Sequence, residues 1–309
     1  MSFKLTVLGS GSALPTSEKF PTAHVLNVHE RFFLIDCGEG TQIQLRRYRI
    51  SIAKIKHIFI SHLHGDHFYG LIGLISTRNL LGITSDLHIY AHSEIKRLLD
   101  PQINFMKGEL GYTILFHPLN FKSPQIVFSD KMVEVLSFPL RHSIPVCGFL
   151  FKEKQALPKL RKDEVERLDI PIRERQAIKE GGGYLDSAGH YHEHSELTIP
   201  PVSSRSYAYC TDTTPFEPAV EFFKGASLLY HEATFQSDME EWAAKTFHST
   251  AQQAGIIARK AGVNQLLIGH FSNRYDSDES FLNEARKEFT ETYLAREGKT
   301  YRIEINRNR

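Results

Sequence analysis

The chain has 309 residues, of which 41% are hydrophobic and 24% charged, and its formal net charge is +1. This composition is ample for a sizeable core and fits one large α/β domain or two small ones. The balanced charge excludes a global basic field that would attract nucleic acid, so any RNA contact must come from local patches. No apolar run approaches the roughly 20 residues that span a bilayer, and residues 1–5 lead into a predicted strand without a signal peptide.

Predicted strands and helices alternate along the first half of the chain, as the hydrophobic periodicity indicates. Strands are expected at residues 3–8, 23–28, 31–35, 57–60 and 87–90, and helices at 41–48, 68–81 and 93–99. Thr41 is the expected N-cap of the first helix. The pattern becomes strand-rich after residue 131. It then alternates again, with helices at 215–223, 250–261 and 278–294 and a strand at 301–305.

Residues 152–201 interrupt this rhythm. The segment is polar, contains three consecutive glycines at 181–183, and carries nine Lys/Arg against seven Asp/Glu between residues 152 and 180. A long insertion of this kind in a compact domain is usually functional or mobile. RNA binding and a plain solvated excursion both stay open. His190, His192 and His194 alternate with polar residues here, which favours solvated side chains over metal ligands.

The run His62-Leu63-His64-Gly65-Asp66-His67 is the most informative motif. Side chains alternate along a strand, so His62 and His64 would point the same way at the end of the strand before them. Gly65 permits a sharp turn, and Asp66 and His67 would follow it at the start of a helix. The motif therefore predicts two neighbouring pairs of metal ligands.

Matching partners occur later in the chain, each after an apolar run that predicts a buried strand. They are His142, Asp212 and His270. In α/β folds the ends of strands are where active sites form. Imidazole and carboxylate suit zinc, and also manganese or iron, and one carboxylate can bridge two ions. We predict one metal held by His62, His64, His142 and Asp212, and a second held by Asp66, His67, His270 and Asp212.

The three cysteines, Cys37, Cys147 and Cys210, are far apart, odd in number and set in apolar surroundings. They are expected to be buried thiols, which indicates a reducing, cytoplasmic compartment. Cys210 stands two residues before Asp212, but it would lie one step deeper along the strand. A thiolate ligand is therefore not expected.

Four further motifs make the chain resemble the ribonuclease Z family, the tRNA 3′-processing endonucleases of the metallo-β-lactamase superfamily. They are LTVLGSGS at residues 5–12, LIDCGEGTQ at 34–42, HEAT at 231–234 and HST at 248–250. The HxHxDH run is shared by lactamases, glyoxalases and lactonases, whereas the combination with these motifs is much more specific. The resemblance covers nearly the whole chain. It implies the metallo-β-lactamase fold, a four-layer αβ/βα sandwich forming one domain over residues 1–309.

The resemblance also implies what the motifs do. Residues 152–201 would be an inserted flexible arm that grips the tRNA elbow, and Asp36 would brace the metal site. Two zinc ions per chain, with manganese or iron as alternatives, would hydrolyse the phosphodiester. Asp66 would orient the water or take its proton, and His248, partnered by Glu232, would protonate the leaving 3′ oxygen. The products would be a tRNA with a 3′ hydroxyl and a trailer with a 5′ phosphate, made by a cytoplasmic homodimer without membrane attachment.

Residues 15–20, Pro-Thr-Ser-Glu-Lys-Phe, stand where the family has a loop of pattern PxKxRN that is associated with discrimination against a 3′ CCA end. Only Pro15 matches outright: Lys19 stands where an arginine is usual, and Ser17 and Phe20 replace the lysine and the asparagine. A lysine lacks the planar fork that holds phosphate or base edges bidentately, whereas a phenylalanine could stack on a base. Relaxed discrimination is the expected result.

Two other functions remain in competition. The same fold and metals would serve a phosphodiesterase acting on small phosphodiesters, although the long insertion argues against it. A non-catalytic RNA-binding subunit is the alternative from a different class, and the complete ligand set argues against that. Lactamase activity is disfavoured because amide hydrolysis in those enzymes does not use the proton donor that the HEAT and HST motifs supply.

Overall fold

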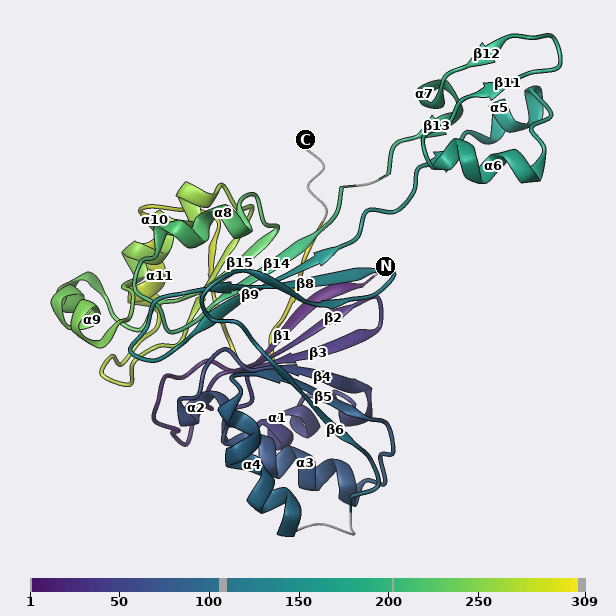
Figure 1. Ribbon diagram of the computed structural model, residues 1–309. Coiled ribbons are helices and arrows are strands. Elements are labelled where there is room, and N and C mark those ends of the chain that lie inside the picture. The colour runs from purple at the N-terminus through teal and green to yellow at the C-terminus, as the bar shows by residue number, and fades with distance from the viewer. Residues whose placement is uncertain (1, 106–109, 202, 305–309) are drawn as a thin grey trace. The chain divides into compact units, whose positions relative to one another are not determined.

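The computed structural model describes residues 2–105, 110–201 and 203–304, and it divides into two compact units. The larger unit, called the body below, comprises Met1–Glu153 and Arg205–Asn306. The smaller unit, called the insert, comprises Lys154–Ser204. Figure 1 shows the elements of both units along the chain.

The first sheet of the body has seven strands in the order β18-β1-β2-β3-β4-β5-β6. Strands β3 to β6 run parallel, whereas β2 lies antiparallel to both of its neighbours. The strands are β1 (Phe3–Gly9), β2 (Ala23–Val28), β3 (Arg31–Ile35), β4 (Ile55–Phe59), β5 (Leu87–Ala91), β6 (Ile114–Pro118) and β18 (Thr300–Arg302).

The second sheet also has seven strands, in the order β17-β16-β15-β14-β9-β8-β7. Its strands β14 to β17 run parallel, and β7, β8 and β9 join them as an antiparallel meander. The strands are β7 (Gln125–Ser129), β8 (Val133–Pro139), β9 (Cys147–Glu153), β14 (Ser206–Cys210), β15 (Leu228–Glu232), β16 (Leu266–Gly269) and β17 (Thr292–Leu294).

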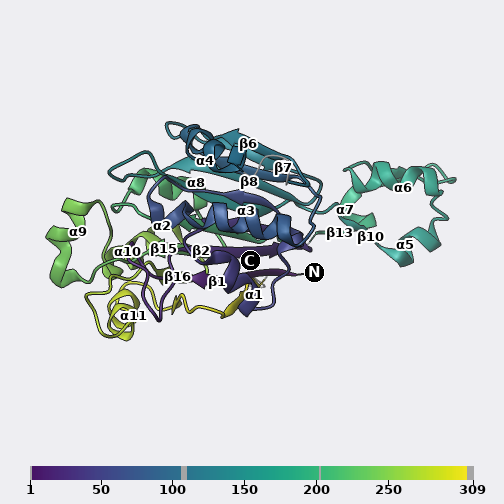
Figure 2. The ribbon, with the colours of Figure 1, turned by 90° about the horizontal axis from the view of Figure 1, so that it is seen from below.

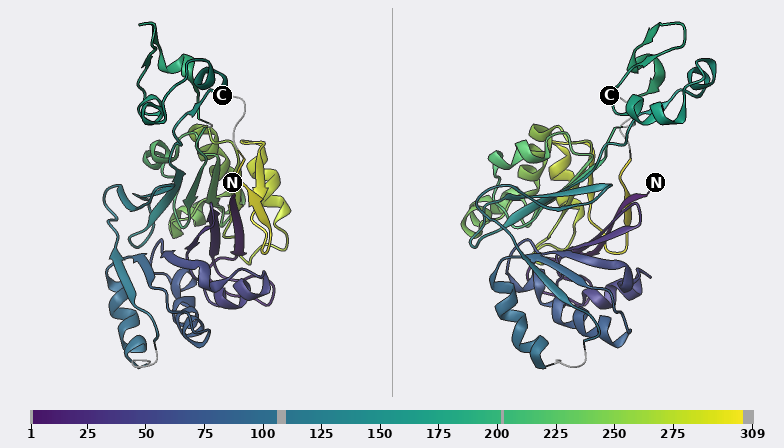
Figure 3. Two further views of the ribbon diagram at one scale, coloured as in Figure 1. Left: turned by 90° about the vertical axis from the view of Figure 1, so that its right-hand side faces the viewer. Right: turned by 45° about the vertical axis from the view of Figure 1, so that its right-hand side comes forward.

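Three apolar layers hold the body together. One core lies between the sheets and joins residues such as Leu5 and Phe33 to Phe151 and Tyr230. A second lies under α1, α3 and α4, and a third under α8, α10 and α11 (Figures 1 and 3). This helix–sheet–sheet–helix order confirms the predicted four-layer αβ/βα sandwich.

The helices of the body cover the outer faces of the sheets or lead from one strand to the next. The α-helices are α1 (Thr41–Arg47), α2 (Gly65–Phe68), α3 (Gly70–Leu80), α4 (Glu94–Phe105), α8 (Val220–Phe223), α9 (Glu240–Thr246), α10 (Ala251–Ala261) and α11 (Glu279–Arg286). Short 3₁₀ turns are η1 (Ile52–Lys54), η2 (Glu217–Ala219) and η3 (Ser237–Met239). Within the described ranges, no helix combines the length and the apolar character that crossing a bilayer requires.

Several element boundaries differ from the sequence prediction. Helix α1 is capped by Gly40 in the left-handed region (φ 78°), while Thr41 donates its hydroxyl to the Gly38 carbonyl. The helix predicted over 93–99 continues as α4, because Ile103 extends the four-residue spacing of Ile95 and Leu99. The helix predicted over 215–223 is divided between η2 and α8, with a proline in the 3₁₀ turn.

The helix predicted over 278–294 is wrong in its second half. Helix α11 ends at Arg286, and residues 292–294 form β17 at the edge of the second sheet. The helical spacing of apolar residues continues past Arg286. The backbone of residues 292–294 nevertheless forms its hydrogen bonds with β16, where Leu266 pairs with Thr292, and not within a helix. The predicted final strand is β18, and residue 305 lies outside the described residues.

The insert has its own small core, in which Ile170, Ile178 and Leu197 are buried together. Figure 2 shows its helices and strands from a second side. Its elements are β10 (Lys159–Leu160), α5 (Lys162–Arg167), α6 (Ile172–Lys179), β11 (Tyr184–Leu185), β12 (Tyr191–His192), α7 (His194–Leu197) and β13 (Thr198–Ile199). Strands β10 and β13 pair where the chain enters and leaves it.

Glu153 and Arg205, the body residues on either side of the insert, contact each other. Arg205 donates from Nη2 to Glu153 Oε1 at 2.6 Å and from Nε to Oε2 at 2.9 Å, and both side chains are almost completely buried. The backbone N–H of Glu153 also donates to the Arg205 carbonyl. Strands β9 and β14, which end and begin here, are therefore fixed side by side whatever chain lies between them.

Candidate metal centre

The predicted ligands lie where strands end, as the sequence indicated. His62 and His64 follow β4, His142 follows β8, and His270 comes directly after β16. Helix α2 begins at Gly65, between the first ligand pair and the second, where a Cβ would lie 2.2 Å from the ring of Tyr69. A side chain at this position would therefore displace the exposed Tyr69 ring.

Three residues of the site have a positive backbone φ angle, which residues other than glycine rarely adopt. Asp36, Asp212 and His270 have φ values of 55°, 43° and 61°, and each follows a strand closely. Such conformations cost roughly 1–3 kcal/mol each and persist where the surrounding structure enforces them, often at functional sites. Here they turn each side chain from the end of its strand into the centre.

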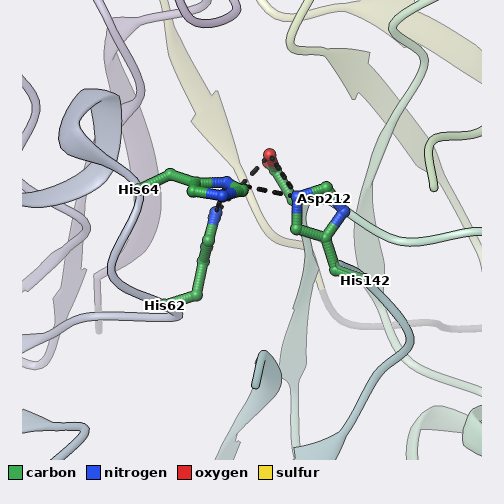
Figure 4. Close-up of side chains that lie close together, drawn as sticks. All are labelled: His62, His64, His142 and Asp212. Atoms are coloured by element: carbon green, nitrogen blue, oxygen red, sulfur yellow. Dashed lines mark hydrogen bonds and ion pairs between the residues drawn. The ribbon is translucent and has the colours of Figure 1, made fainter. Parts of the chain in front are cut away.

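The first group is formed by His62, His64, His142 and Asp212 (Figure 4). His64 Nδ1 lies 3.1 Å from His62 Nε2 and 3.2 Å from His142 Nε2. Asp212 Oδ2 lies 3.6 Å from His62 Nε2 and 3.8 Å from His142 Nε2. Four potential ligand atoms, from residues that follow the ends of three strands, thus converge on one point.

The second group is formed by Asp66, His67 and His270, with Asp212 beside it. Asp66 Oδ2 lies 3.3 Å from His67 Nε2 and 3.5 Å from His270 Nε2. Asp212 Oδ1 lies 3.2 Å from His67 Nε2 and 3.3 Å from His270 Nε2. The two oxygens of Asp212 therefore face different groups, which is the geometry of a bridging carboxylate.

In four of these histidines the nitrogen that faces away from the centre is already bonded. The bonds run from His62 Nδ1 to Ser61 Oγ, from His67 Nδ1 to Asp36 Oδ2, from His142 Nδ1 to the Phe247 carbonyl, and from His270 Nδ1 to Thr234 Oγ1. Such bonds fix the tautomer, so each Nε2 offers a lone pair to the centre. This is the arrangement expected of metal-binding imidazoles.

The donors fit a divalent cation. The buried Nε2 of His67 has no hydrogen-bond partner among the described residues. Burial alone would lower the pKa of His67, but the carboxylates of Asp212, Asp66 and Asp36 raise it well above its ordinary value. The centre therefore favours positive charge. Burial also lowers the pKa of His62 to about 4, which leaves that imidazole neutral and able to ligate.

Asp36 supports the centre from behind. It is buried, and it accepts hydrogen bonds from His67 Nδ1 at 2.8 Å, from the hydroxyl of Tyr209 at 2.6 Å and from the backbone and hydroxyl of Ser61. The predicted bracing position of Asp36 agrees with these contacts. Sequence reasoning missed Tyr209, which comes from the other sheet and has no local signal.

His248 and Glu232 form a second polar pair at the edge of the metal groups. His248 Nδ1 lies 2.8 Å from Glu232 Oε1, and the carboxylate also accepts from Thr213 and Thr234. Burial alone would lower the pKa of His248, but Glu232 outweighs it and raises that pKa to about 9. The buried carboxylate of Glu232 therefore favours the protonated form of His248. His248 also lies close enough to Asp212 and His270 for the three residues to form a third group of potential metal ligands.

Other residues singled out in the sequence lie outside the centre. All three cysteines are free and buried, as predicted, and burial raises the pKa of Cys210. In the insert, His192 Nε2 bonds Asp186 at 3.1 Å and His194 Nδ1 donates to the Ile178 carbonyl. Both histidines therefore hold the insert's own fold together. His190 is largely exposed.

The loop at residues 15–20 is held by contacts with other parts of the body. Lys19 Nζ lies 2.6 Å from Asp278 Oδ1, and the Phe20 ring packs so closely on Gly40 that a Cβ there would be 2.6 Å from it. The stacking role considered for Phe20 is therefore not favoured. Pro15 lines the cavity in front of the two groups of potential ligands.

A cavity of about 680 Å³ opens in front of the two groups. Its lining includes five potential metal ligands (His64, Asp66, His142, Asp212 and His270), together with His248, Tyr69 and Arg274. Tyr69 and Arg274 were not predicted from the sequence. The cavity is large enough for a phosphodiester and the nucleotides on either side of it.

Two relatives are similar to this chain over almost its whole length. A protein named Ribonuclease Z from Phocaeicola vulgatus is 46% identical over 303 residues, which cover 98% of this chain and 97% of the relative. One of the same name from Bacteroides thetaiotaomicron is 47% identical over 295 residues, covering 96% and 93%. The chain belongs to the ribonuclease Z family.

Comparison of folds agrees with this assignment. The crystal structure of the short form of human tRNase Z matches with a TM-score of 0.72 and 26% identity, covering 98% of this chain and all of the human one. A metallo-β-lactamase fold protein, YhfI from Bacillus subtilis, matches with a TM-score of 0.68 and 17% identity over 98% of this chain and all of that one, which shows the fold alone. A family model described as anti-Pycsar protein Apyc1 also matches residues 3–129. The body of this ribonuclease Z family member therefore has the metallo-β-lactamase fold.

Proposed function

We propose that this protein is an endoribonuclease that removes the 3′ trailer of precursor tRNA by hydrolysing one phosphodiester. The observation that carries the proposal is the position of Asp212 between two ligand groups, beside the His248–Glu232 pair, in a chain of the ribonuclease Z family. A dinuclear centre next to a proton donor is suited to displacement at phosphorus.

We propose that each chain binds two zinc ions, with manganese or iron able to take their place. One ion would be held by His62, His64, His142 and Asp212 and the other by Asp66, His67, His270 and Asp212. Bound there, the ions would activate water and neutralise charge on the phosphate oxygens.

The remaining chemistry belongs to side chains. Asp66, whose Oδ2 is fixed by the backbone N–H of Ala13 at 2.9 Å, would orient the attacking water or take its proton. His248, charged and held by Glu232, would protonate the leaving 3′ oxygen of the tRNA. The tRNA would then end in a 3′ hydroxyl and the trailer would begin with a 5′ phosphate.

We further propose that the insert is a substrate-binding arm on an otherwise single domain. Its independent core and the Glu153–Arg205 pair at its base are consistent with a module added to the body. The insert contributes no residue to the described metal groups, so its role would be to hold the RNA.

Assembly and compartment are part of the same proposal. Exposed apolar side chains on α3 and α4, including Leu80 and Leu98, offer a surface that a second copy could cover, which supports a homodimer. Three free, buried cysteines support a reducing, cytoplasmic compartment. Light scattering on the purified protein would test the dimer.

One assay separates this function from its main alternative. The purified protein is incubated with a 3′-extended precursor tRNA and with a small bis-aryl phosphodiester, and the product ends are mapped. Cleavage of the tRNA at a single position, with a 3′ hydroxyl on the tRNA, is expected. Efficient cleavage of the small diester without cleavage of the tRNA would favour the small-substrate phosphodiesterase.

A further inference from the structure

Tyr209 connects the second sheet to Asp36, the carboxylate behind the metal groups. It lies on β14, it is completely buried, and its hydroxyl donates to Asp36 Oδ2 at 2.6 Å. Burial, followed by the negative charge of Asp36, raises the pKa of Tyr209 well above its ordinary value. The phenol therefore keeps its proton and is the donor in this contact.

Packing fixes the ring of Tyr209 independently of this hydrogen bond. Tyr209 and Tyr230 are paired in register on β14 and β15, and their rings stack with centres 5.1 Å apart and an angle of 10° between the planes. His24 packs edge-on against the Tyr209 ring at 5.2 Å. Tyr230 and His24 are also completely buried. Replacing Tyr209 by phenylalanine would therefore remove the donor and leave the packed ring in place.

Asp36 contacts one imidazole of each metal group, directly or through one hydroxyl. His67, of the second group, bonds Asp36 Oδ2 through Nδ1 at 2.8 Å. The hydroxyl of Ser61 donates to the same oxygen at 2.9 Å and lies 3.0 Å from Nδ1 of His62, of the first group. Because the single hydrogen of that hydroxyl goes to Asp36, its oxygen accepts from His62. One carboxylate thus fixes the tautomers of two imidazoles, and both leave Nε2 for an ion.

We propose that Tyr209 is a positioning residue that holds Asp36 in place and, through it, one ligand of each metal group. The inference rests on the two metal sites of the proposed function. Asp212 links the groups through its two oxygens, whereas Asp36 links them through the imidazole nitrogens that face away from the ions. Partners of this kind typically change metal affinity 10–100-fold when they are lost. Tyr209 acts one hydrogen bond further away, so a smaller effect that reaches both ions is expected.

The test measures zinc affinity by competition between the zinc-loaded protein and a chromogenic chelator. Tyr209→Phe is expected to raise the Kd of both ions by about three- to tenfold. Ser61→Ala breaks the link to His62 alone and should weaken the ion of the first group more than that of the second. Tyr207→Phe is the matched control. It lies on the same strand, its hydroxyl meets His24 and not Asp36, and it should leave both Kd values within about twofold.

Nitrogen-15 NMR of the histidine side chains in the zinc-loaded protein reads the positioning itself. The Nδ1–H protons of His62 and His67 should exchange with solvent faster in Tyr209→Phe than in the wild type, and in Ser61→Ala only that of His62 should. Unchanged affinity and exchange in Tyr209→Phe, or an equal effect of Tyr207→Phe, would overturn the inference. Weakening of the second ion alone would contradict the link through Ser61. A wild-type protein that binds fewer than two ions would instead refute the metal sites of the proposed function.

Discussion

Glu232 and His248 are joined by a contact of 2.8 Å between Oε1 and Nδ1, and the carboxylate is completely buried. Because Glu232 also accepts from two threonines, it cannot turn away from the imidazole. The pair fixes both the charge and the orientation of His248, and the remaining nitrogen, Nε2, is left for another partner.

His248→Ala is therefore expected to slow cleavage of precursor tRNA by roughly 10²–10⁴-fold, the range usual for a lost general acid. Single-turnover rates would measure this. Metal content and RNA affinity should stay at the wild-type level, because His248 is not in either proposed ligand set. An unchanged single-turnover rate would remove His248 from the mechanism.

Asp212→Ala is expected to lose both metal ions together, because each of its oxygens faces a different group. Elemental analysis of the dialysed protein should give two ions per chain for the wild type and none for the variant. Asp276→Asn, which changes an exposed carboxylate outside both groups, is the control. Retention of one ion by Asp212→Ala would contradict the bridging role.

Replacing the insert by a short turn should weaken cleavage of precursor tRNA while sparing small phosphodiesters. Glu153 and Arg205 already lie against each other in the body, so a few glycine and serine residues can join β9 to β14. A smaller deletion of residues 159–194 should act in the same direction. Parallel assays measure the cleavage rate of both substrates. An equal loss of activity on precursor tRNA and on the small phosphodiester would show that the role of the insert is structural.

Acid should destabilise the protein partly through His57. Its ring stacks on His88, and burial first, then the neighbouring His88 and His117, lower the pKa of His57 from 6.5 to about 4. The unfolded chain then binds a proton that the folded one rejects. The contribution of His57 to the free energy of unfolding is fully present above pH 6.5. It is lost as the pH falls toward 4, and the loss is at most about 3 kcal/mol.

Urea unfolding at several pH values would test this contribution. His57→Phe keeps a ring in the stack and should show a smaller loss of unfolding free energy between pH 6.5 and pH 4 than the wild type. His190→Gln, at a largely exposed position in the insert, serves as the control. Identical pH dependence in His57→Phe and the wild type would assign the acid sensitivity to other groups.

Discrimination against a 3′ CCA end should be relaxed. The loop at residues 15–20 lacks the usual arginine, and its lysine, Lys19, is already paired with Asp278. A precursor tRNA with an encoded CCA should be cut, with the cut after the CCA. Mapping of product ends measures this. Refusal of that substrate, together with cleavage of a CCA-less one after the discriminator base, would show that the loop discriminates by other contacts.

The members of the two groups could be predicted because each has a signal in the sequence around it. His62 to His67 lie at one strand end and one turn, and each distant partner follows an apolar run of its own. The contact of Tyr209 with Asp36 has no such signal, because it joins residues that only tertiary packing brings together. The strand at 292–294 was missed for a similar reason, since pairing with β16 overrides a helical pattern.

One feature of the topology bears on how the protein is made. Strand β1 is completed on its outer side by β18, with Leu5 paired to Tyr301, and the ligand groups join His62 to His270. A nascent chain on the ribosome therefore cannot complete the second group until His270 has emerged. A chain that stops before that residue is not expected to cut the RNA around its site of synthesis.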